Sequence, residues 1–402
     1  MARALAKAPT PFYLCSTAPL REALREARAL GPKAADGATA GRPAVRHWLS
    51  CKTQPVRPLL RWWRQQGLGV EVVSEYELLA ARAEGYPPER ILVNGPAKHH
   101  WLPRHPWRGL SVNFDSLREL AALLPAARTL NWRVGVRCHT HQEHDPDQPR
   151  EPTQFGLLPA EAVTALRRLQ RAGLRLETVH FHLRTNVASP TIYARAMAEV
   201  AAICRAADFH PLYLDCGGGV PPHAVRTHAG RRVDGEFDLG ALARVYARAA
   251  RLFPGLREVW LENGRFISAR SGVLVVRVLE VKERGPVRQL ICDGGRTTQA
   301  LVSVWEAHEL FSLPSRGGPL VPTTVCGPTC MAFDQLARRR LPRTLRAGDY
   351  LVWLDAGAYH LPWETRFSHG YAAVVWHEHG RLTLAREHEP FAAWWGQWKR
   401  GR

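Results

Sequence analysis

Cys330 and Asp334 are the residues whose types and setting point most directly to chemistry. They lie in the segment Val325–Asp334, where the pair Gly327–Pro328 precedes the thiol and the carboxylate. Proline fixes its own backbone and glycine permits a sharp bend, so such a turn aims the side chains that follow it. The segment therefore predicts a reaction site, and the partner groups for that chemistry must come from elsewhere in the chain.

Lys52 is a second residue with chemical potential, because it ends an apolar segment that is typical of a buried strand. Burying an ammonium group is costly unless its pKa falls or it forms a covalent bond. Two interpretations follow. Lys52 is either a Schiff-base lysine or a lysine at a strand end that reaches solvent.

Three consecutive glycines, Gly217, Gly218 and Gly219, follow the strand-like segment 212–216. Glycines allow backbone N–H groups to approach and surround a phosphate. The segment lacks the Lys-Ser/Thr of a nucleotide P-loop and the spacing of a dinucleotide fingerprint. It is therefore either a phosphate cup at the end of a barrel strand or only a tight turn.

Two further strand ends carry polar groups. Glu262 precedes Gly264 and Arg265, and such a carboxylate can hold a protonated pyridine nitrogen while the arginine reaches a phosphate. The alternative is a surface ion pair. His180 and His182 end another strand-like segment, where an imidazole either stacks on a planar cofactor or belongs to the core.

Short apolar runs alternate with helical patterns over most of the chain, and this rhythm predicts about eight parallel βα units closing into a barrel. From about residue 266 the pattern changes to strands and turns without long helices. We therefore expect an α/β fold, a (β/α)8 TIM-like barrel plus a C-terminal all-β domain that also takes the N-terminal strand. The expected boundaries are 1–30 for an N-terminal strand and helix packing with the β-domain, 31–265 for the barrel, and 266–402 for the β-domain.

Composition narrows the class of protein. The chain has 402 residues, eight cysteines without disulfide-framework spacing and a net charge of +19. We expect a cytoplasmic protein with reduced thiols, no secretory signal and no membrane partner. The arginines are spread over helix faces rather than gathered in a nucleic-acid motif, which favours solvated surfaces over nucleic-acid binding.

The motifs and their order resemble the fold-type III pyridoxal-phosphate decarboxylases, the diaminopimelate, ornithine and arginine decarboxylase family, over nearly the whole chain. The similar segments are Thr10–Tyr13, Lys52, Gly67–Leu78, Glu89–Ile91, Gly95–Lys98, Phe114–Ser116, Gln154–Gly156, His180–His182, Leu214–Pro221, Glu262–Arg265, Cys292–Gly295, Val325–Asp334 and Gly357–Tyr359.

The resemblance implies roles at the matching positions. Lys52 would carry pyridoxal 5'-phosphate as a Schiff base, with Glu71 close to it, His182 stacked on the ring and Glu262 on the pyridine nitrogen. The phosphate would be bound by Gly217, Gly218, Gly219, Gly264, Arg265 and Tyr359, with Thr185 also in reach.

The resemblance also implies a homodimer with shared active sites, in which Cys330 and Asp334 reach into the partner's site. Cys330 would return a proton to the carbon after loss of CO2. The implied activity is decarboxylation of an amino acid, with catalytic residues Lys52, Glu262 and Cys330.

The chain departs from the family pattern where the family reads its substrate. Met331 replaces the glutamate expected after the cysteine, and Leu301 replaces an arginine that contacts a carboxylate in diaminopimelate enzymes. The family's Gly-Ser-Gln after the histidine is Arg184-Thr185-Asn186. With Arg184, Arg296, Met331 and Asp334 in the substrate site, we expect an amino acid conjugated to a polycarboxylate rather than diaminopimelate or ornithine.

Three alternatives remain open at this point. The same cofactor supports racemisation or other carbanion chemistry, and a non-catalytic relative would bind the cofactor only. The segment 138–145 is dense in potential metal ligands, including His139, His141 and His144. We interpret it as a solvated loop, and we assign no metal site.

Overall fold

The computed structural model describes residues 1–33, 42–143, 152–223, 225–227, 230–235, 237–299 and 306–398. The chain divides into two compact units. One comprises Ala23–Pro221 and Asp234–Gly264, and the other Met1–Glu22, Pro222–Val233 and Arg265–Arg402. In the described chain no helix is long and apolar enough to cross a membrane.

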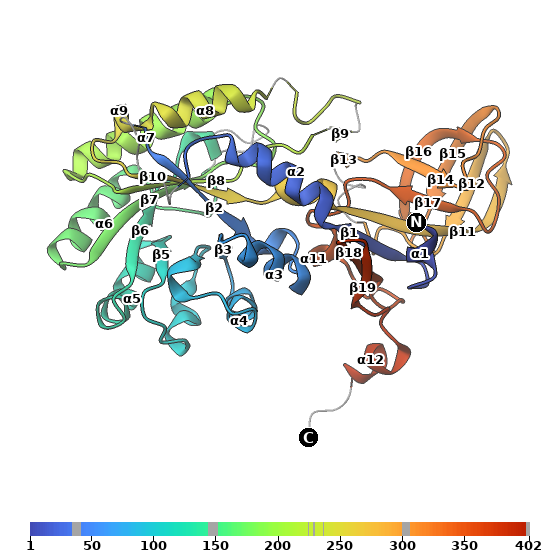
Figure 1. Ribbon diagram of the computed structural model, residues 1–402, viewed down its shortest axis with the longest axis horizontal. Coiled ribbons are helices and arrows are strands. Elements are labelled where there is room, and N and C mark those ends of the chain that lie inside the picture. The colour runs from blue at the N-terminus through green and yellow to red at the C-terminus, as the bar shows by residue number, and fades with distance from the viewer. Residues whose placement is uncertain are drawn as a thin grey trace. The chain divides into compact units, whose positions relative to one another are not determined.

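The first unit is the barrel expected from the sequence (Figure 1). Within the described residues, eight parallel strands close on themselves in the order β10-β2-β3-β4-β5-β6-β7-β8. The strands are β2 Ala44–Ser50, β3 Gly69–Val72, β4 Ile91–Val93, β5 Ser111–Phe114, β6 Arg133–Arg137, β7 Arg175–His182, β8 Tyr213–Gly217 and β10 Glu258–Asn263.

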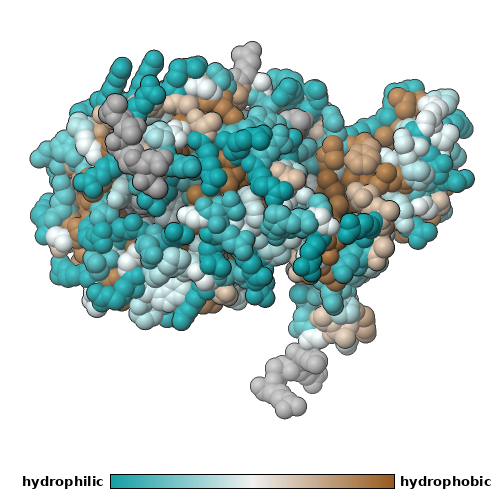
Figure 2. Space-filling model, viewed as in Figure 1, coloured by the Kyte–Doolittle hydropathy of each residue, from teal (hydrophilic) through white to brown (hydrophobic). Residues whose placement is uncertain are grey.

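Helices cover the outside of this barrel (Figure 1). They are α3 Arg57–Gln65, α4 Glu75–Ala83, α5 Leu117–Thr129, α6 Pro159–Arg171, α7 Thr191–Ala207, α8 Leu239–Ala247 and α9 Ala249–Leu252. Because helices shield one face and packed side chains the other, the strands are largely buried, as in the fully buried, apolar run 91–93. The faces of the helices that point to solvent are hydrophilic, and Figure 2 shows hydrophilic residues over most of this unit.

Within the described residues, the βα rhythm is interrupted once, between β4 and β5. This stretch contains Pro103 and Pro106, and it forms only the 3₁₀ turns Lys98–His100 and Leu102–Arg104. Proline lacks a backbone N–H and clashes with the preceding turn, so a continuous α-helix cannot form across it. The other 3₁₀ turns in the described part of the chain are Cys51–Thr53, Pro88–Arg90, His141–Glu143 and Ala269–Ser271.

The second unit is built on a sheet, also as expected. In the described chain the sheet has nine strands, and β1 Phe12–Ser16 lies inside it, antiparallel to β11 and parallel to β18. The others are β11 Gly272–Arg284, β12 Val287–Cys292, β14 Leu310–Leu313, β15 Leu320–Cys326, β16 Gln335–Pro342, β17 Tyr350–Trp353, β18 Ala373–Glu378 and β19 Arg381–Arg386.

A short ladder and five helices complete the described elements. Strands β9 Arg226–Thr227 and β13 Glu306–Ala307 pair with each other. The helices are α1 Ala2–Leu5, α2 Thr17–Arg28, α10 Arg265–Ser268, α11 His360–Trp363 and α12 Phe391–Gly396. Helix α2 begins in the β-sheet unit and ends in the barrel unit. The core of the sheet unit includes Phe12, Val275, Val352 and Val375, all fully buried.

A buried ion pair fixes the loops that follow β4 and β5. The Lys98 ammonium lies 2.7 Å from a Glu119 carboxylate oxygen, and both side chains are fully buried. Glu119 also accepts hydrogen bonds from the backbone N–H groups of Lys98 (2.9 Å) and Asp115 (3.0 Å). One glutamate therefore joins two loops at the carboxyl ends of neighbouring strands, where barrel enzymes place their active sites.

This pair generates a stability prediction. Lys98→Ala leaves the Glu119 charge buried and unpaired, so we expect a loss of about 3–5 kcal/mol in the free energy of unfolding of the barrel. Urea denaturation followed by fluorescence measures it. Lys98→Met combined with Glu119→Gln removes both charges and keeps an oxygen for one of the two backbone N–H groups, so it is expected to recover part of the loss. The control is Arg104→Ala, which breaks an exposed ion pair with Glu75 and should change little. An equal effect of Lys98→Ala and Arg104→Ala would contradict the account.

Candidate active site

A cavity of about 370 Å³ lies within the barrel unit, lined by residues at the carboxyl ends of its strands. Lys52 follows β2, Glu71 belongs to β3, Arg137 ends β6 and His182 ends β7. The strand ends converge there because parallel strands all finish at the same edge of a barrel. The lining consists of Lys52, Glu71, Val73, Asn94, Gly95, Pro96, Arg137, Glu143, Thr153, Phe155, His180, His182, Leu183, Arg184, Thr185 and Glu262.

Lys52 and Glu71 form an ion pair in this cavity. The ammonium nitrogen lies 3.0 and 2.9 Å from the two Glu71 carboxylate oxygens. The Glu71 side chain is buried, whereas 29% of the Lys52 side chain remains exposed. A carboxylate thus holds a lysine amine at the cavity wall, where a ligand can reach it.

Glu262 contacts three polar groups. Asn94 donates a hydrogen bond to one carboxylate oxygen (2.6 Å), and the same oxygen lies 3.0 Å from His180 Nε2. The second oxygen lies 3.0 Å from His182 Nδ1. Burial opposes ionisation of Glu262, but the charges and hydrogen bonds of His182 and His180 outweigh burial and hold its pKa well below the ordinary value. Glu262 is therefore a fixed, ionised carboxylate.

Strand register explains how His182 and Glu262 meet. Gly217 of β8 lies opposite Glu262 of β10 and opposite His182 of β7. A Cβ atom on Gly217 would lie 2.4 Å from His182 Nδ1 and 2.9 Å from a Glu262 oxygen. Only glycine leaves room for this contact, so Gly217 has a packing role in addition to any role in ligand binding.

The glycine segment bends sharply after β8. Gly218 has a φ of 63° and Gly219 a φ of 91°, both in the left-handed region that favours glycine. The Tyr193 hydroxyl donates a 2.6 Å hydrogen bond to the Gly218 carbonyl and fixes this conformation. The sharp turn is therefore present, and its glycines let the backbone approach the cavity-lining residue His182 closely.

Behind Glu262 lies a chain of amides that sequence reasoning missed. Asn113 donates hydrogen bonds to the side-chain oxygen Oδ1 of Asn94 (3.0 Å) and to the Asp215 carboxyl (2.8 Å). Burial, then the charges of Glu262 and Glu71, raise the pKa of Asp215 well above its ordinary value. The Asp215 carboxyl therefore takes up a proton more readily than an ordinary aspartate beside the charged Glu262. The signal was available, because an asparagine inside or directly after an apolar strand is unusual.

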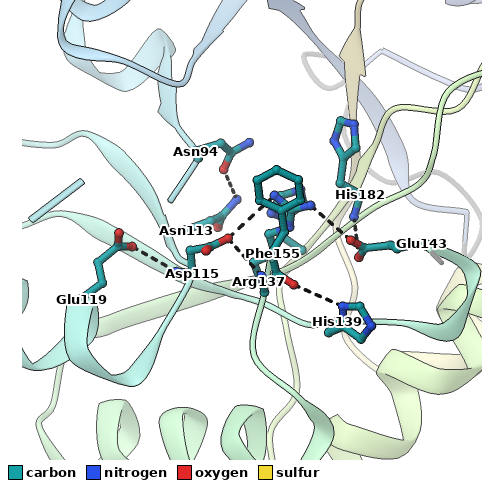
Figure 3. A network of polar contacts seen from close by, with 12 residues as sticks. Asn94, Asn113, Asp115, Glu119, Arg137, His139, Glu143, Phe155 and His182 are labelled. Carbon is teal, nitrogen blue, oxygen red and sulfur yellow. Dashed lines mark hydrogen bonds and ion pairs between the residues drawn. The ribbon is translucent and has the colours of Figure 1, made fainter. Parts of the chain in front are cut away.

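Arg137 is the centre of a second network (Figure 3). Its guanidinium group donates to Glu143 (3.2 Å), lies 3.7 Å from Asp115 and stands over the Phe155 ring at 4.7 Å. Burial raises the pKa of Glu143 despite the neighbouring Arg137 charge. Arg137 thus ties the 3₁₀ turn after β6 to the loop after β5. Sequence reasoning gave it no role, although it ends a strand that carries the site.

Arg265 and Tyr359 belong to the sheet unit, where the structure brings them together. The guanidinium carbon of Arg265 lies 4.8 Å from the centroid of the Tyr359 ring. Arg265 also pairs with the buried Glu306. Tyr359 has a φ of 66° and immediately precedes α11. This left-handed backbone conformation, which is unusual for a tyrosine, turns the chain sharply just before the helix.

Asp334 is buried and holds its own loop together. Its carboxylate accepts hydrogen bonds from the backbone N–H of Arg296 (2.7 Å) and from the backbone N–H (3.1 Å) and hydroxyl (2.6 Å) of Thr329. A Cβ atom on Gly327 would lie 2.3 Å from this carboxylate. Glycine is therefore required in this Gly-Pro turn because the Asp334 carboxylate packs against it. In the resulting loop, Cys330 is exposed to solvent.

The residues that the sequence predicts to contact the substrate belong to both units. Arg184 and the exposed Thr185 line the barrel cavity. Met331 is half-buried in the Asp334 loop, and the Arg296 guanidinium stands 5.5 Å from the ring centroid of Phe333 in that loop. Gly264 is half-buried and is the last residue before Arg265. Leu301 lies outside the described residues.

The histidine-rich segment after β6 is used by the fold. His139 Nδ1 lies 3.2 Å from the Phe155 carbonyl oxygen, and the backbone N–H of His141 donates to Glu199 at 2.8 Å. Cys138 is buried. His144 and Asp145 lie outside the described residues. Cys138 and His139 are thus part of the packed interior, whereas the His141 side chain is 78% exposed.

Comparison with known proteins decides the family. A model of the pyridoxal-dependent decarboxylases, for their pyridoxal-binding domain, matches residues 39–269. The chain belongs to this family. It is therefore a carboxy-lyase that uses pyridoxal phosphate.

Curated relatives agree. The chain is 30% identical to a diaminopimelate decarboxylase of Deinococcus radiodurans over 393 residues, which covers 96% of this chain and 95% of the relative. It is 33% identical to one of Actinosynnema pretiosum over 324 residues, covering 77% of this chain and 72% of the relative.

Solved structures share the fold. The diaminopimelate decarboxylase of Helicobacter pylori complexed with L-lysine has a TM-score of 0.83 at 22% identity, with 98% of each chain covered. A lysine/ornithine decarboxylase of Vibrio vulnificus complexed with cadaverine has a TM-score of 0.77 at 20% identity, covering 93% of this chain and 94% of that one.

The cavity of the decarboxylase fits its cofactor chemically. It presents a lysine amine held by a carboxylate, and an ionised Glu262 that can face a ring nitrogen. Beside them, His182 offers a planar ring, and the backbone of Gly217 and Gly218 lies directly against this ring with no Cβ atom between them. These are the groups that hold a lysine-linked, phosphorylated pyridine.

One further carboxyl next to the cavity titrates near neutral pH. Burial and the charge of Glu71 raise the pKa of Glu77 from 4.5 to about 7. Its carboxylate accepts a 2.8 Å hydrogen bond from the backbone N–H of Val73, a cavity-lining residue. Glu77 belongs to the first turn of α4, whose N-terminus Ser74 caps.

The raised pKa of Glu77 predicts a pH dependence of stability. Between pH 4.5 and about 7 the unfolded chain has lost this proton while the folded decarboxylase keeps it. Glu77 therefore destabilises the fold increasingly as pH rises through this window, and not below it. Glu77→Gln keeps an oxygen for the Val73 N–H, so we expect its stability relative to the parent to rise from about pH 5 to about pH 8. Denaturation midpoints measure this, with Glu89→Gln on the surface as control. A difference independent of pH would contradict the assignment.

Proposed function

We propose that this decarboxylase removes the α-carboxylate of an amino acid of the diaminopimelate/ornithine type that carries additional carboxylates. The observation that carries the proposal is the shared cavity of Lys52 and Glu262. A lysine amine and a fixed, ionised carboxylate line one space of about 370 Å³. The decarboxylase family and this arrangement together support decarboxylation as the reaction.

Each cavity residue has a task in this proposal. When bound, pyridoxal phosphate supplies an electron sink for the carbanion that remains after CO2 leaves. Lys52 would hold the cofactor through its amine, and Glu71 would keep that amine oriented. Glu262 would keep a proton on the ring nitrogen, because an ionised carboxylate stabilises the protonated form beside it. His182, held by Glu262, would place its ring against the cofactor.

Phosphate binding would use the glycine segment after β8 together with residues from other parts of the chain. The N–H groups of Gly217, Gly218 and Gly219 are candidates for the barrel side, with Thr185 on the cavity rim. Gly264 and Arg265 follow Asn263 at the end of β10, and Tyr359 stands against the Arg265 guanidinium. An arginine fixed by an aromatic ring and a carboxylate is a pre-organised phosphate ligand.

We propose a homodimer in which the Cys330 loop enters the partner's cavity. Cys330 and Phe333 are exposed, 59% in the case of Phe333, although the buried Asp334 holds their loop rigidly. A rigid loop that presents a thiol and an aromatic ring to solvent suits an interface. There Cys330 of the partner subunit would donate a proton to the carbon that has lost CO2.

The substrate proposal rests on charge. Arg184 lines the cavity, and Arg296 lies beside the Cys330 loop. Met331 in that loop carries no charge for a distal ammonium group. These residues favour carboxylates on the distal arm of the substrate, as in an amino acid conjugated to a polycarboxylate. We also propose a cytoplasmic location, which the eight free cysteines support.

Release of CO2 from a panel of amino acids tests the substrate proposal. We expect the highest kcat/KM for diamino acids conjugated to a polycarboxylate. Arg184→Ala should lower kcat/KM for these substrates about 10–100-fold, which corresponds to the free energy of one hydrogen bond to a charged group. Arg195→Ala, an exposed arginine on α7, is the matched control. Cofactor absorbance verifies loading in each variant. Equal rates with and without added carboxylates, and no effect of Arg184→Ala, would refute the substrate class. Loss of the α-proton without CO2 release would refute decarboxylation.

Subunit complementation tests the shared site. Lys52→Ala and Cys330→Ala should each lack activity as homodimers. If Cys330 acts in the partner's cavity, random mixing gives hybrid dimers with one intact site, and about a quarter of the parent activity returns. Mixing Lys52→Ala with the double variant Lys52→Ala/Cys330→Ala is the control and restores nothing. No recovery after verified subunit exchange would place Cys330 outside the partner's site.

A further inference from the structure

A cluster of buried metal-ligating side chains lies in the sheet unit, outside the motifs that the sequence singled out. Glu306 belongs to β13, His308 follows that strand, and His360 begins α11. The three residues are at most 1% exposed. One potential ligand atom from each lies within 4.8 Å of the others.

Of the three side chains in this cluster, His360 has polar atoms without a hydrogen-bond partner among the described residues. His308 Nε2 lies 2.8 Å from one Glu306 oxygen, and the other oxygen of Glu306 pairs with Arg265. Among the described residues, neither ring nitrogen of His360 has a hydrogen-bond partner, although the side chain is fully buried. The His360 ring stands edge-on to His308, with centroids 5.1 Å apart.

An imidazole without a partner in the interior is costly, since it has left its water hydrogen bonds and gained none. His360 therefore needs a ligand for at least one nitrogen. Potential ligand atoms of His308 and Glu306 lie within 4.8 Å of it, and both of these groups already have partners. A cation that accepts lone pairs from all three side chains would satisfy them together.

We propose that Glu306, His308 and His360 bind one zinc ion. Two imidazoles and one carboxylate are a donor set that zinc uses in proteins, with a fourth position left for water. The three side chains come from two segments about 50 residues apart, so the ion would join β13 and the residues after it to α11.

The surroundings of the cluster resemble the outer shell of a metal site. Ligating carboxylates are usually hydrogen-bonded through their other oxygen, and Arg265 occupies that oxygen of Glu306. A ligating histidine usually donates its second N–H to an acceptor. Gln299 reaches His308 Nδ1 with its amide nitrogen at 3.5 Å, while its buried carbonyl oxygen has no partner among the described residues. Rotation of the amide by half a turn would supply the acceptor.

The consequence is structural. Zinc would fix Glu306, which holds Arg265, and His360, which follows Tyr359 directly. The two residues that stand together as candidate phosphate ligands would thus be anchored from behind. This inference concerns the sheet unit alone, and it does not depend on the substrate or on the proposed sharing of sites.

Metal analysis of the tag-free, full-length protein tests the site. After exposure to zinc and removal of excess, we expect about one zinc per chain by mass spectrometry and a higher unfolding temperature than after chelator treatment. Cobalt replacement should give the visible absorption bands of a tetrahedral site. His360→Gln and His308→Gln should each lower zinc affinity at least about 10-fold, the scale known for weakened metal sites. His379→Gln, an exposed histidine of the same unit, should leave it unchanged.

Two results would overturn the proposal. One is a parent protein that takes up neither zinc nor cobalt with the expected bands. This measurement needs no variant, so it holds even where a substitution impairs folding. The other is His360→Gln that retains one tightly bound zinc per chain with parent affinity.

Discussion

A buried negative charge at the carboxyl end of the barrel is the constraint on which the active-site cavity depends. Glu262 stays ionised in the interior only because His180, His182 and Asn94 surround its two oxygens. Low polarity makes each of these contacts strong and makes the loss of any of them costly. The same charge helps to raise the pKa of Asp215, so the pKa values of two neighbouring carboxyls are shifted in opposite directions.

Strand register places these groups more strictly than local sequence does. His182 and Glu262 meet over Gly217, and Asn113 extends toward Asp215 past Gly135, where a Cβ atom would lie 2.1 Å from the Asn113 amide oxygen. Each contact pairs a long polar side chain with a glycine in the neighbouring strand. Substitution of either glycine would therefore act through the charge of Glu262 as well as through packing.

The sequence predicted the barrel, the sheet unit with its N-terminal strand, and the family. Hydrophobic periodicity and the order of motifs can be recognised in the sequence alone, without knowing which residues are in contact. It also directed attention to Lys52 and Glu262. The networks of Asn94 and Arg137 were missed, because they join strands that are distant in sequence and depend on register. Asp334 shows the same limit. Its spacing from Cys330 indicated chemistry, whereas its three hydrogen bonds show a carboxylate that shapes the loop.

The central claim is that ionised Glu262 makes the barrel cavity a site for decarboxylation. The most direct test is CO2 release by Glu262→Gln, measured with cofactor content verified by absorbance. Glutamine keeps the size of the side chain and its contacts with Asn94 and His180 but removes the charge. The account predicts that the variant binds the cofactor and loses CO2 release by orders of magnitude. Release at the parent rate from a loaded variant would contradict it.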